Sequence, residues 1–195
     1  MTHRDQALKR KMALFRDLRQ RMPAPSGLKP DGMQEAFPLG IGSFPMGRLE
    51  NVDSIHLNWV NEHFFEYVPD GAHPLRFSRS TGEQITPGRM FTDGGSIPRE
   101  FWWKQGLSPW EYGPAYLIHD WEFDLHHCHE SARTFEEVRD TMMEALRTLM
   151  TMPVVTYRPF VFELIYDGIN SRYAKSAWNQ DPGCTLPRPV TTADS

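Results

Sequence analysis

Two short segments of the chain carry the side chains best suited to chemistry. The first is Phe91-Thr-Asp-Gly-Gly-Ser-Ile-Pro98, in which Asp93 and Ser96 place an acid and a hydroxyl in a glycine-rich turn. The second pairs His119 with Asp120 inside an otherwise apolar stretch. Ionisable groups are costly to bury without partners, so we expect these side chains to form a shared polar site.

The residue types suggest particular roles within that site. His119 is a candidate general base because imidazole titrates near neutral pH. Ser96 is a candidate ligand, helix cap or nucleophile, although no GxSxG elbow surrounds it. Carboxylates beside a glycine-rich backbone can hold a cation, so three acids are candidate ligands for calcium or zinc: Asp93, Asp120 and Glu122. The alternative for the glycine-rich segment is a turn that only joins a strand to the next element.

The two cysteines and the chain's first residues bear on its surroundings. The N-terminus is charged and lacks the apolar region of a signal peptide, and no apolar run approaches the roughly 20 residues of a membrane span. We therefore expect an intracellular protein with Cys128 and Cys184 as free thiols. The run His126-His-Cys-His-Glu130 is typical of a polar helix end, and it predicts a zinc site only if the helix breaks there.

Charge is distributed unevenly along the 195 residues. Residues 1–22 contain seven Lys or Arg side chains against two Asp, a net charge of +5, and the remainder carries −9. An acidic body is unsuited to polyanions, so contact with nucleic acid or a membrane is expected only through residues 1–22. The amphipathic spacing of this segment favours docking on its own domain or on a second copy of the chain, and contact with nucleic acid or a membrane is the alternative.

Hydrophobic spacing indicates the elements that must position these groups. Residues 4–22 have the periodicity of an amphipathic helix, and residues 23–47 form a Pro/Gly-rich connector or loop. Strands are expected within 55–68, and as a hairpin of 75–79 and 84–86 around the turn at 80–83. Helices follow at about 114–127, at 134–150 behind a capping box at Thr134, and at about 159–177.

The order of strands first and helices later favours an α+β fold. We expect a small antiparallel sheet or hairpins packed on about three C-terminal helices, preceded by the N-terminal amphipathic helix. The corresponding segments are a helical arm (1–22), a connector (23–50), one globular domain (51–178) and a polar tail (179–195).

The two chemical segments also carry a resemblance. The chain resembles the phage and prophage family of domain of unknown function 1353, in which a strand pair precedes a T-D-[GA]-x-S-[VI]-P-R segment, a hydrophobic-His-Asp helix and a later helix with Asp. The matching residues are Phe91–Arg99, Ile118–Phe123 and Asp140–Leu146, within about 64–178. The resemblance implies a phage or prophage origin, and therefore a place in the host cytoplasm or in a virion, and supplies no activity.

A second likeness is mechanistic. His119-Asp120 on one helix, with Asp140 on another, looks like phospholipase A2, and this likeness implies a His that activates water, a calcium-binding Asp and a distant Asp that orients the His. Phe123 replaces the tyrosine of that pattern, and the glycine-rich turn lacks the phospholipase calcium-loop pattern. The helical wheel also places Asp140 about 150° from the centre of its helix's apolar stripe, where solvent-facing charges lie.

Two functions follow as hypotheses. The first is a phage virion or assembly-associated component, able to self-associate through the N-terminal helix, in which a buried polar network rigidifies the fold. The second is a metal-assisted hydrolase of ester bonds, calcium-dependent in the manner of phospholipases, with His119 as the general base.

Overall fold

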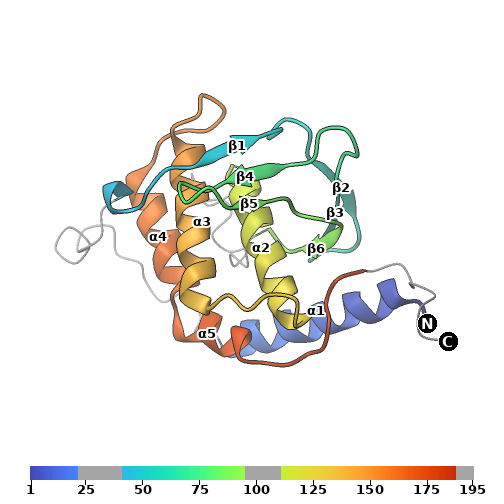
Figure 1. Ribbon diagram of the computed structural model, residues 1–195. Helices are drawn as coiled ribbons and strands as arrows, with labels where there is room; N and C mark the ends of the chain where they lie inside the picture. Colours follow the sequence, from blue (N-terminus) through green and yellow to red (C-terminus); the bar gives the residue numbers. More distant parts are fainter. Residues whose placement is uncertain (22–40, 95–110, 188–195) are drawn as a thin grey trace.

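The structure is a computed structural model that describes residues 1–21, 41–94 and 111–187, and these residues form an α+β fold (Figure 1). The expected fold class is confirmed. The helical elements are α1 (His3–Arg21), the short 3-10 helix η2 (Ile41–Ser43), α2 (Gly113–His127), α3 (Phe135–Met150), α4 (Pro159–Ile169) and α5 (Arg172–Trp178). The strands are β1 (Arg48–Glu50), β2 (His56–Trp59), β3 (Phe65–Val68), β4 (Arg76–Ser78), β5 (Gln84–Ile85) and β6 (Met90–Thr92).

The strands form two small antiparallel sheets, ordered β1-β4-β5 and β2-β3-β6. The central strand of each sheet supplies a fully buried aromatic residue, Phe77 in β4 and Tyr67 in β3. Phe77 pairs with Leu49 and Ile85, which are also buried. The expected hairpin corresponds to β4 and β5. β1 lies within the segment expected to be a connector, and β6 leads directly into Asp93.

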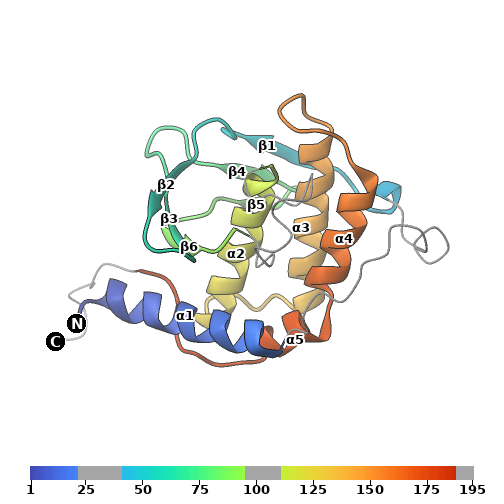
Figure 2. The same ribbon diagram turned by 180° about the vertical axis from the view of Figure 1, so that it is seen from behind.

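The sheets lie beside α2 and α3, which contact each other along their length (Figures 1 and 2). Thr134 caps α3 through the expected box with Glu137. The buried side of α3 includes apolar residues at helical spacing: Phe135, Val138, Met142, Ala145, Leu146 and Leu149. The helix expected at 159–177 is two helices, because Asn170 ends α4 and the Ser171 side chain accepts a hydrogen bond that starts α5.

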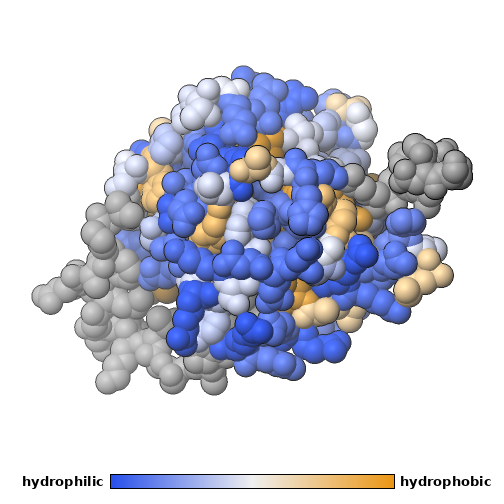
Figure 3. Space-filling view, turned by 60° about the horizontal axis from the view of Figure 1, so that its bottom comes forward, coloured by the Kyte–Doolittle hydropathy of each residue, from blue (hydrophilic) through white to orange (hydrophobic). Residues whose placement is uncertain are grey.

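α1 packs on its own domain. Figures 1 and 2 show it along one end of the molecule, beside α5 and the segment that follows α5. Ala7 and Leu14 are buried, and Ala7 packs in a cluster with Phe64 and Phe91. Arg4 donates two hydrogen bonds of 3.1 Å to the buried carboxylate of Glu66. The apolar side of α1 faces inward, against Phe64 and Phe91. The face turned forward in Figure 3 is mainly hydrophilic.

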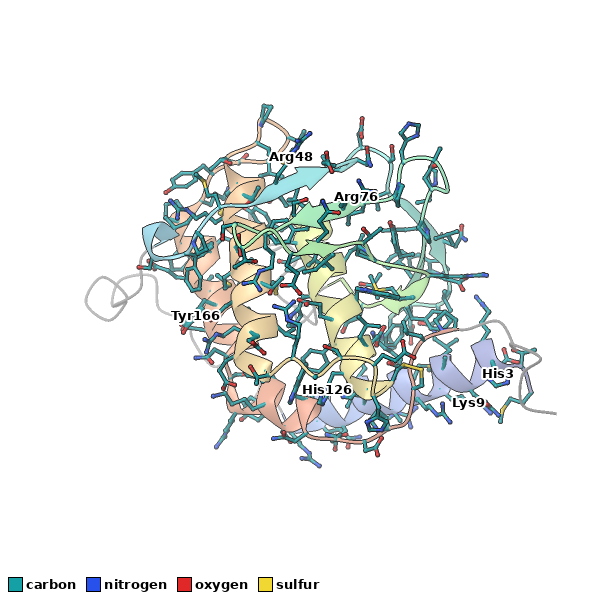
Figure 4. The ribbon with its side chains drawn as sticks, in the orientation of Figure 1. His3, Lys9, Arg48, Arg76, His126 and Tyr166 are labelled. Carbon is teal, nitrogen blue, oxygen red and sulfur yellow. A yellow bond between two sulfur atoms is a disulfide. The ribbon has the colours of Figure 1, made fainter. Side chains whose placement is uncertain are left out.

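The cysteines do not remain free thiols: Cys128 and Cys184 form a disulfide, visible as a yellow bond in Figure 4. Cys128 ends α2, and the segment after α5 returns alongside it, which brings the two Cα atoms within 4.0 Å. Sequence spacing could not reveal this return path. Among the described residues, no helix is long and apolar enough to cross a membrane.

Candidate functional site: a buried carboxylate cluster

Two carboxylates on one face of α2 form the centre of the candidate site. Asp120 and Asp124 are four residues apart, so the helix places them one above the other. Only 7% of Asp120 and 1% of Asp124 is exposed. The Thr92 hydroxyl donates a 2.6 Å hydrogen bond to Asp120, and the Thr185 hydroxyl donates one of the same length to Asp124.

A lysine from α1 supplies the positive charge. Lys11 Nζ lies 2.6 Å from Asp124 Oδ1, the same oxygen that accepts from Thr185. Burial alone would lower the pKa of Lys11, but the carboxylates of Asp124, Asp120 and Asp93 outweigh it and raise that pKa. Lys11 is therefore charged at neutral pH and balances part of the negative charge of the cluster.

The third carboxylate comes from the end of β6. Asp93 is 7% exposed, and the next residue, Gly94, has a φ of 81°, the left-handed region that glycine adopts without strain. This turn lets the Gly94 amide donate to the Thr92 hydroxyl at 3.1 Å. Burial and the nearby charge of Asp93 raise the pKa of Asp120 to about 7, although Lys11 and Thr92 oppose the shift.

His119 is partly buried beside this cluster. Its ring packs against Phe123 with 5.3 Å between centroids, and its Nδ1 has no hydrogen-bond partner among the described residues. Burial, with a smaller contribution from the Lys11 charge, lowers the pKa of His119 to about 4. The imidazole is therefore neutral at pH 7.

The structure brings together only some of the residues singled out from the sequence. Asp93 and Asp120 share one cluster, with His119 close to its Lys11 charge. Ser96 lies outside the described residues. Glu122 and Asp140, considered next, belong to other contacts.

Glu122 takes part in a different ionic network. Its carboxylate accepts a hydrogen bond from Arg133, which also pairs with Glu83 at 3.3 Å. Arg79 joins Glu83 to the fully buried Glu144, at 3.1 Å from each. Helical geometry explains the separation, because Glu122 lies about 160° around α2 from Asp120 and faces the β4–β5 hairpin. Glu122 is thus a structural ion-pair partner on the far side of α2 from the cluster.

Asp140 lies on the solvent side of α3. Its side chain is 44% exposed and pairs with the neighbouring Arg139 at 2.7 Å. The wheel position explains this placement, since the apolar stripe of α3 faces the core on the opposite side. The described contacts of Asp140 give it no role in orienting His119.

Four residues of the cluster were not singled out from the sequence: Lys11, Thr92, Asp124 and Thr185. Asp124 carries a usable signal, because it lies one helical turn after Asp120. Lys11 and Thr185 carry none, since each meets Asp124 only through the folding of distant segments, 113 and 61 residues apart in the chain.

The cluster suits an internal cation better than a metal. Calcium needs six to eight oxygen ligands, whereas here the Lys11 ammonium and the two threonine hydroxyls already engage the Asp120 and Asp124 carboxylates. Within the described ranges, no group of three or more His, Cys, Asp or Glu side chains has the arrangement to hold a metal ion.

The chain was compared with known proteins in three ways, and no family model, curated protein or solved structure matched it.

The raised pKa of Asp120 predicts a measurable pH effect. The folded protein holds this proton up to about pH 7, whereas an unfolded Asp releases it near 3.8. Between pH 4.5 and 6.5 this proton therefore makes stability fall as pH rises. Asp120→Asn removes the effect, so the variant should gain about 2–3 kcal/mol in free energy of unfolding over this range relative to the wild type.

Urea unfolding at a series of pH values measures this difference. Asp70→Asn is the matched control: backbone hydrogen bonds from His73 and Ala72 lower the pKa of Asp70, so its difference from the wild type should stay constant over the same range. A constant difference for Asp120→Asn as well would contradict the proton assignment.

Proposed function

We propose that this chain is a phage or prophage protein, a virion or assembly-associated component whose two motifs build a buried polar network. The observation that carries the proposal is the double occupation of Asp124 Oδ1, by Lys11 from α1 and by Thr185 from the segment after α5. Three separate parts of the chain meet on one carboxylate oxygen. Such a contact holds a fold together and leaves that oxygen little capacity to bind anything else.

The hydrogen bonds around Asp120 support the same role. The Thr92 hydroxyl donates to Asp120 and accepts from the Gly94 amide, so both its donor and one acceptor site are used. The T-D-G part of the motif therefore connects β6 to α2. The satisfied hydrogen bonds of Thr92 rigidify this junction, which suits a component of a particle.

Two further features agree with a place in or on a virion. The Cys128–Cys184 disulfide is of a kind that persists in oxidising surroundings, including virion surfaces. α1 turns its apolar side toward its own domain, so a particle partner or a second copy of the chain would meet its outward basic side. The origin itself rests on the motif resemblance at Phe91–Arg99 and Ile118–Phe123.

A second candidate is an ester hydrolase, favoured by one observation. Neutral His119 precedes Asp120 directly in the chain. The pKa of His119 is about 4 and that of Asp120 is about 7, so the usual order of a histidine and an aspartate is reversed. Groups perturbed in this way are frequent in active sites. The exposed position of Asp140 counts against the phospholipase arrangement, because His119 then lacks that orienting carboxylate.

One experiment separates the two candidates. We expect the wild type to hydrolyse phosphatidylcholine vesicles no faster than buffer, with or without calcium, and to show no rise in melting temperature with calcium or zinc. His119→Ala should be compared with the exposed control His73→Ala. Calcium-dependent hydrolysis that His119→Ala abolishes and His73→Ala retains would establish the hydrolase.

Mass spectrometry of purified phage particles tests the first candidate, and absence of the chain from them would contradict it.

A further inference from the structure

A cavity of about 570 Å³ lies between the β2-β3-β6 sheet and the helices. Its walls come from the β1–β2 connection and β2, from the end of β6, from the first turns of α2, and from the end of α3 with the loop that follows. Its volume is within the range of roughly 300–1,000 Å³ that small-molecule sites occupy. The cavity is distinct from the carboxylate cluster, although Thr92 forms part of the wall between them.

The described walls are mainly apolar. Phe65 on β3 contributes an aromatic ring. Aliphatic side chains come from four other parts of the chain: Val52, Ile55, Leu57, Leu117, Leu149 and Val155. Removing an apolar molecule from water into such a space is favourable by about 25 cal/mol per Å² of buried surface. The cavity therefore suits a ligand that is largely hydrocarbon.

Tyr116 also lines the cavity. This residue is 1% exposed, and its hydroxyl is buried without a hydrogen-bond partner among the described residues. Burial raises the pKa of Tyr116, so the hydroxyl keeps its proton and remains a donor. A buried donor without an acceptor costs about 1–3 kcal/mol, and a ligand oxygen within reach would recover part of that cost.

The charges around the cavity disfavour an anionic ligand. The charged residues among the described walls are two acids, Asp53 and Glu111, and neither Lys nor Arg is among them. Glu111 is already paired with Arg158 at 3.1 Å, and Asp53 is exposed at the rim. The Thr92 hydroxyl is engaged with Asp120 and Gly94, so it is not a free donor for a ligand.

We propose that this cavity binds a neutral, mainly apolar small molecule with one carbonyl or ether oxygen, which accepts a hydrogen bond from Tyr116. This activity goes beyond the proposed particle role, since it adds a ligand site to a structural protein. The apolar walls provide the affinity, and the hydroxyl provides the preference for an oxygen-bearing molecule.

Three probes of similar size test this inference on the full chain by isothermal titration calorimetry. Butyrophenone carries the carbonyl, n-butylbenzene lacks it, and 4-phenylbutyrate adds a negative charge. We expect butyrophenone to bind about fivefold more tightly than n-butylbenzene, the factor that a net hydrogen bond of about 1 kcal/mol gives. The anion should bind at least tenfold more weakly than the ketone.

Two variants locate the binding. Tyr116→Phe should bring the ketone-to-hydrocarbon ratio close to one, whereas Tyr67→Phe, a fully buried tyrosine outside the cavity walls, should leave it unchanged. Val155→Trp, at a partly exposed wall position, should fill the cavity and weaken both neutral probes.

Three outcomes would overturn the inference: no binding of either neutral probe to the wild type, binding that Val155→Trp does not weaken, or a ketone preference that survives Tyr116→Phe. Melting temperatures of the variants show whether each is folded. If Tyr116→Phe does not fold, Val155→Trp still tests the site.

Discussion

Replacing Lys11 by methionine should lower the free energy of unfolding by about 3–5 kcal/mol at pH 7, the usual cost of removing one partner of a buried ion pair. Methionine keeps much of the length and apolar character of the lysine stem, so the substitution removes mainly the charge. Asp124 would keep the Thr185 hydroxyl on its bonded oxygen, and Asp120 and Asp93 would lose the favourable interaction with the Lys11 charge. Urea unfolding followed by tryptophan fluorescence measures the change.

Lys9→Met is the matched control, on the same helix. Lys9 is exposed (labelled in Figure 4), and its Nζ donates a hydrogen bond of 3.1 Å to the sulfur of Met1. This variant should stay within about 0.5 kcal/mol of the wild type. The loss in Lys11→Met should also shrink toward pH 5, because burial raises the pKa values of Asp120 and Asp124 and their protonation removes the charge that Lys11 balances. Equal effects of the two substitutions would show that the cluster does not depend on Lys11.

Opening the disulfide should have an effect of similar size. Cys128 and Cys184 are 56 residues apart in sequence, and closing a loop of that length stabilises the folded state by about 4 kcal/mol in the chain-entropy treatment. The free energy of unfolding of a folded protein is about 5–15 kcal/mol in total, so Cys184→Ala should lose a large part of it. Thr185 follows Cys184 directly, and its bond to Asp124 should loosen with the bridge.

Reduction provides the internal control for this prediction. A phosphine reductant should destabilise the wild type toward the level of Cys184→Ala and leave that variant unchanged. The double variant Cys128→Ala/Cys184→Ala should be no less stable than Cys184→Ala under reducing conditions. A wild type that reacts with a thiol label without reductant would contradict the disulfide itself.

Local patterns were enough to predict much of the helical half of the fold. The capping box at Thr134 and the apolar spacing of 134–150 depend on residues three or four apart, and the structure has both. The break at Asn170–Ser171 was missed because periodicity continues across it, although Ser171 is a favoured capping residue. β1 and β6 have three residues each, too short for the alternation that indicates a strand.

The candidate site was only half predictable. Asp93 and Asp120 stood out because their types and neighbours are unusual, and the structure places them in one cluster. Their cation was not predictable, because nothing in the sequence shows which basic residue of 1–22 meets which carboxylate. In the structure Arg4 forms an ion pair with Glu66, and Lys11 forms one with Asp124 of the same chain. Net charge along a sequence does not reveal which charges will be neutralised internally.

The meeting of Lys11 and Thr185 on Asp124 also has a consequence for how the protein is made. Chains emerge from the ribosome from the N-terminus onward, and α1 must wait for Thr185 before the cluster is complete. Until then the carboxylates on α2 would be better left in water than buried. The final tightening of this fold is therefore expected to follow synthesis of the segment that contains Thr185.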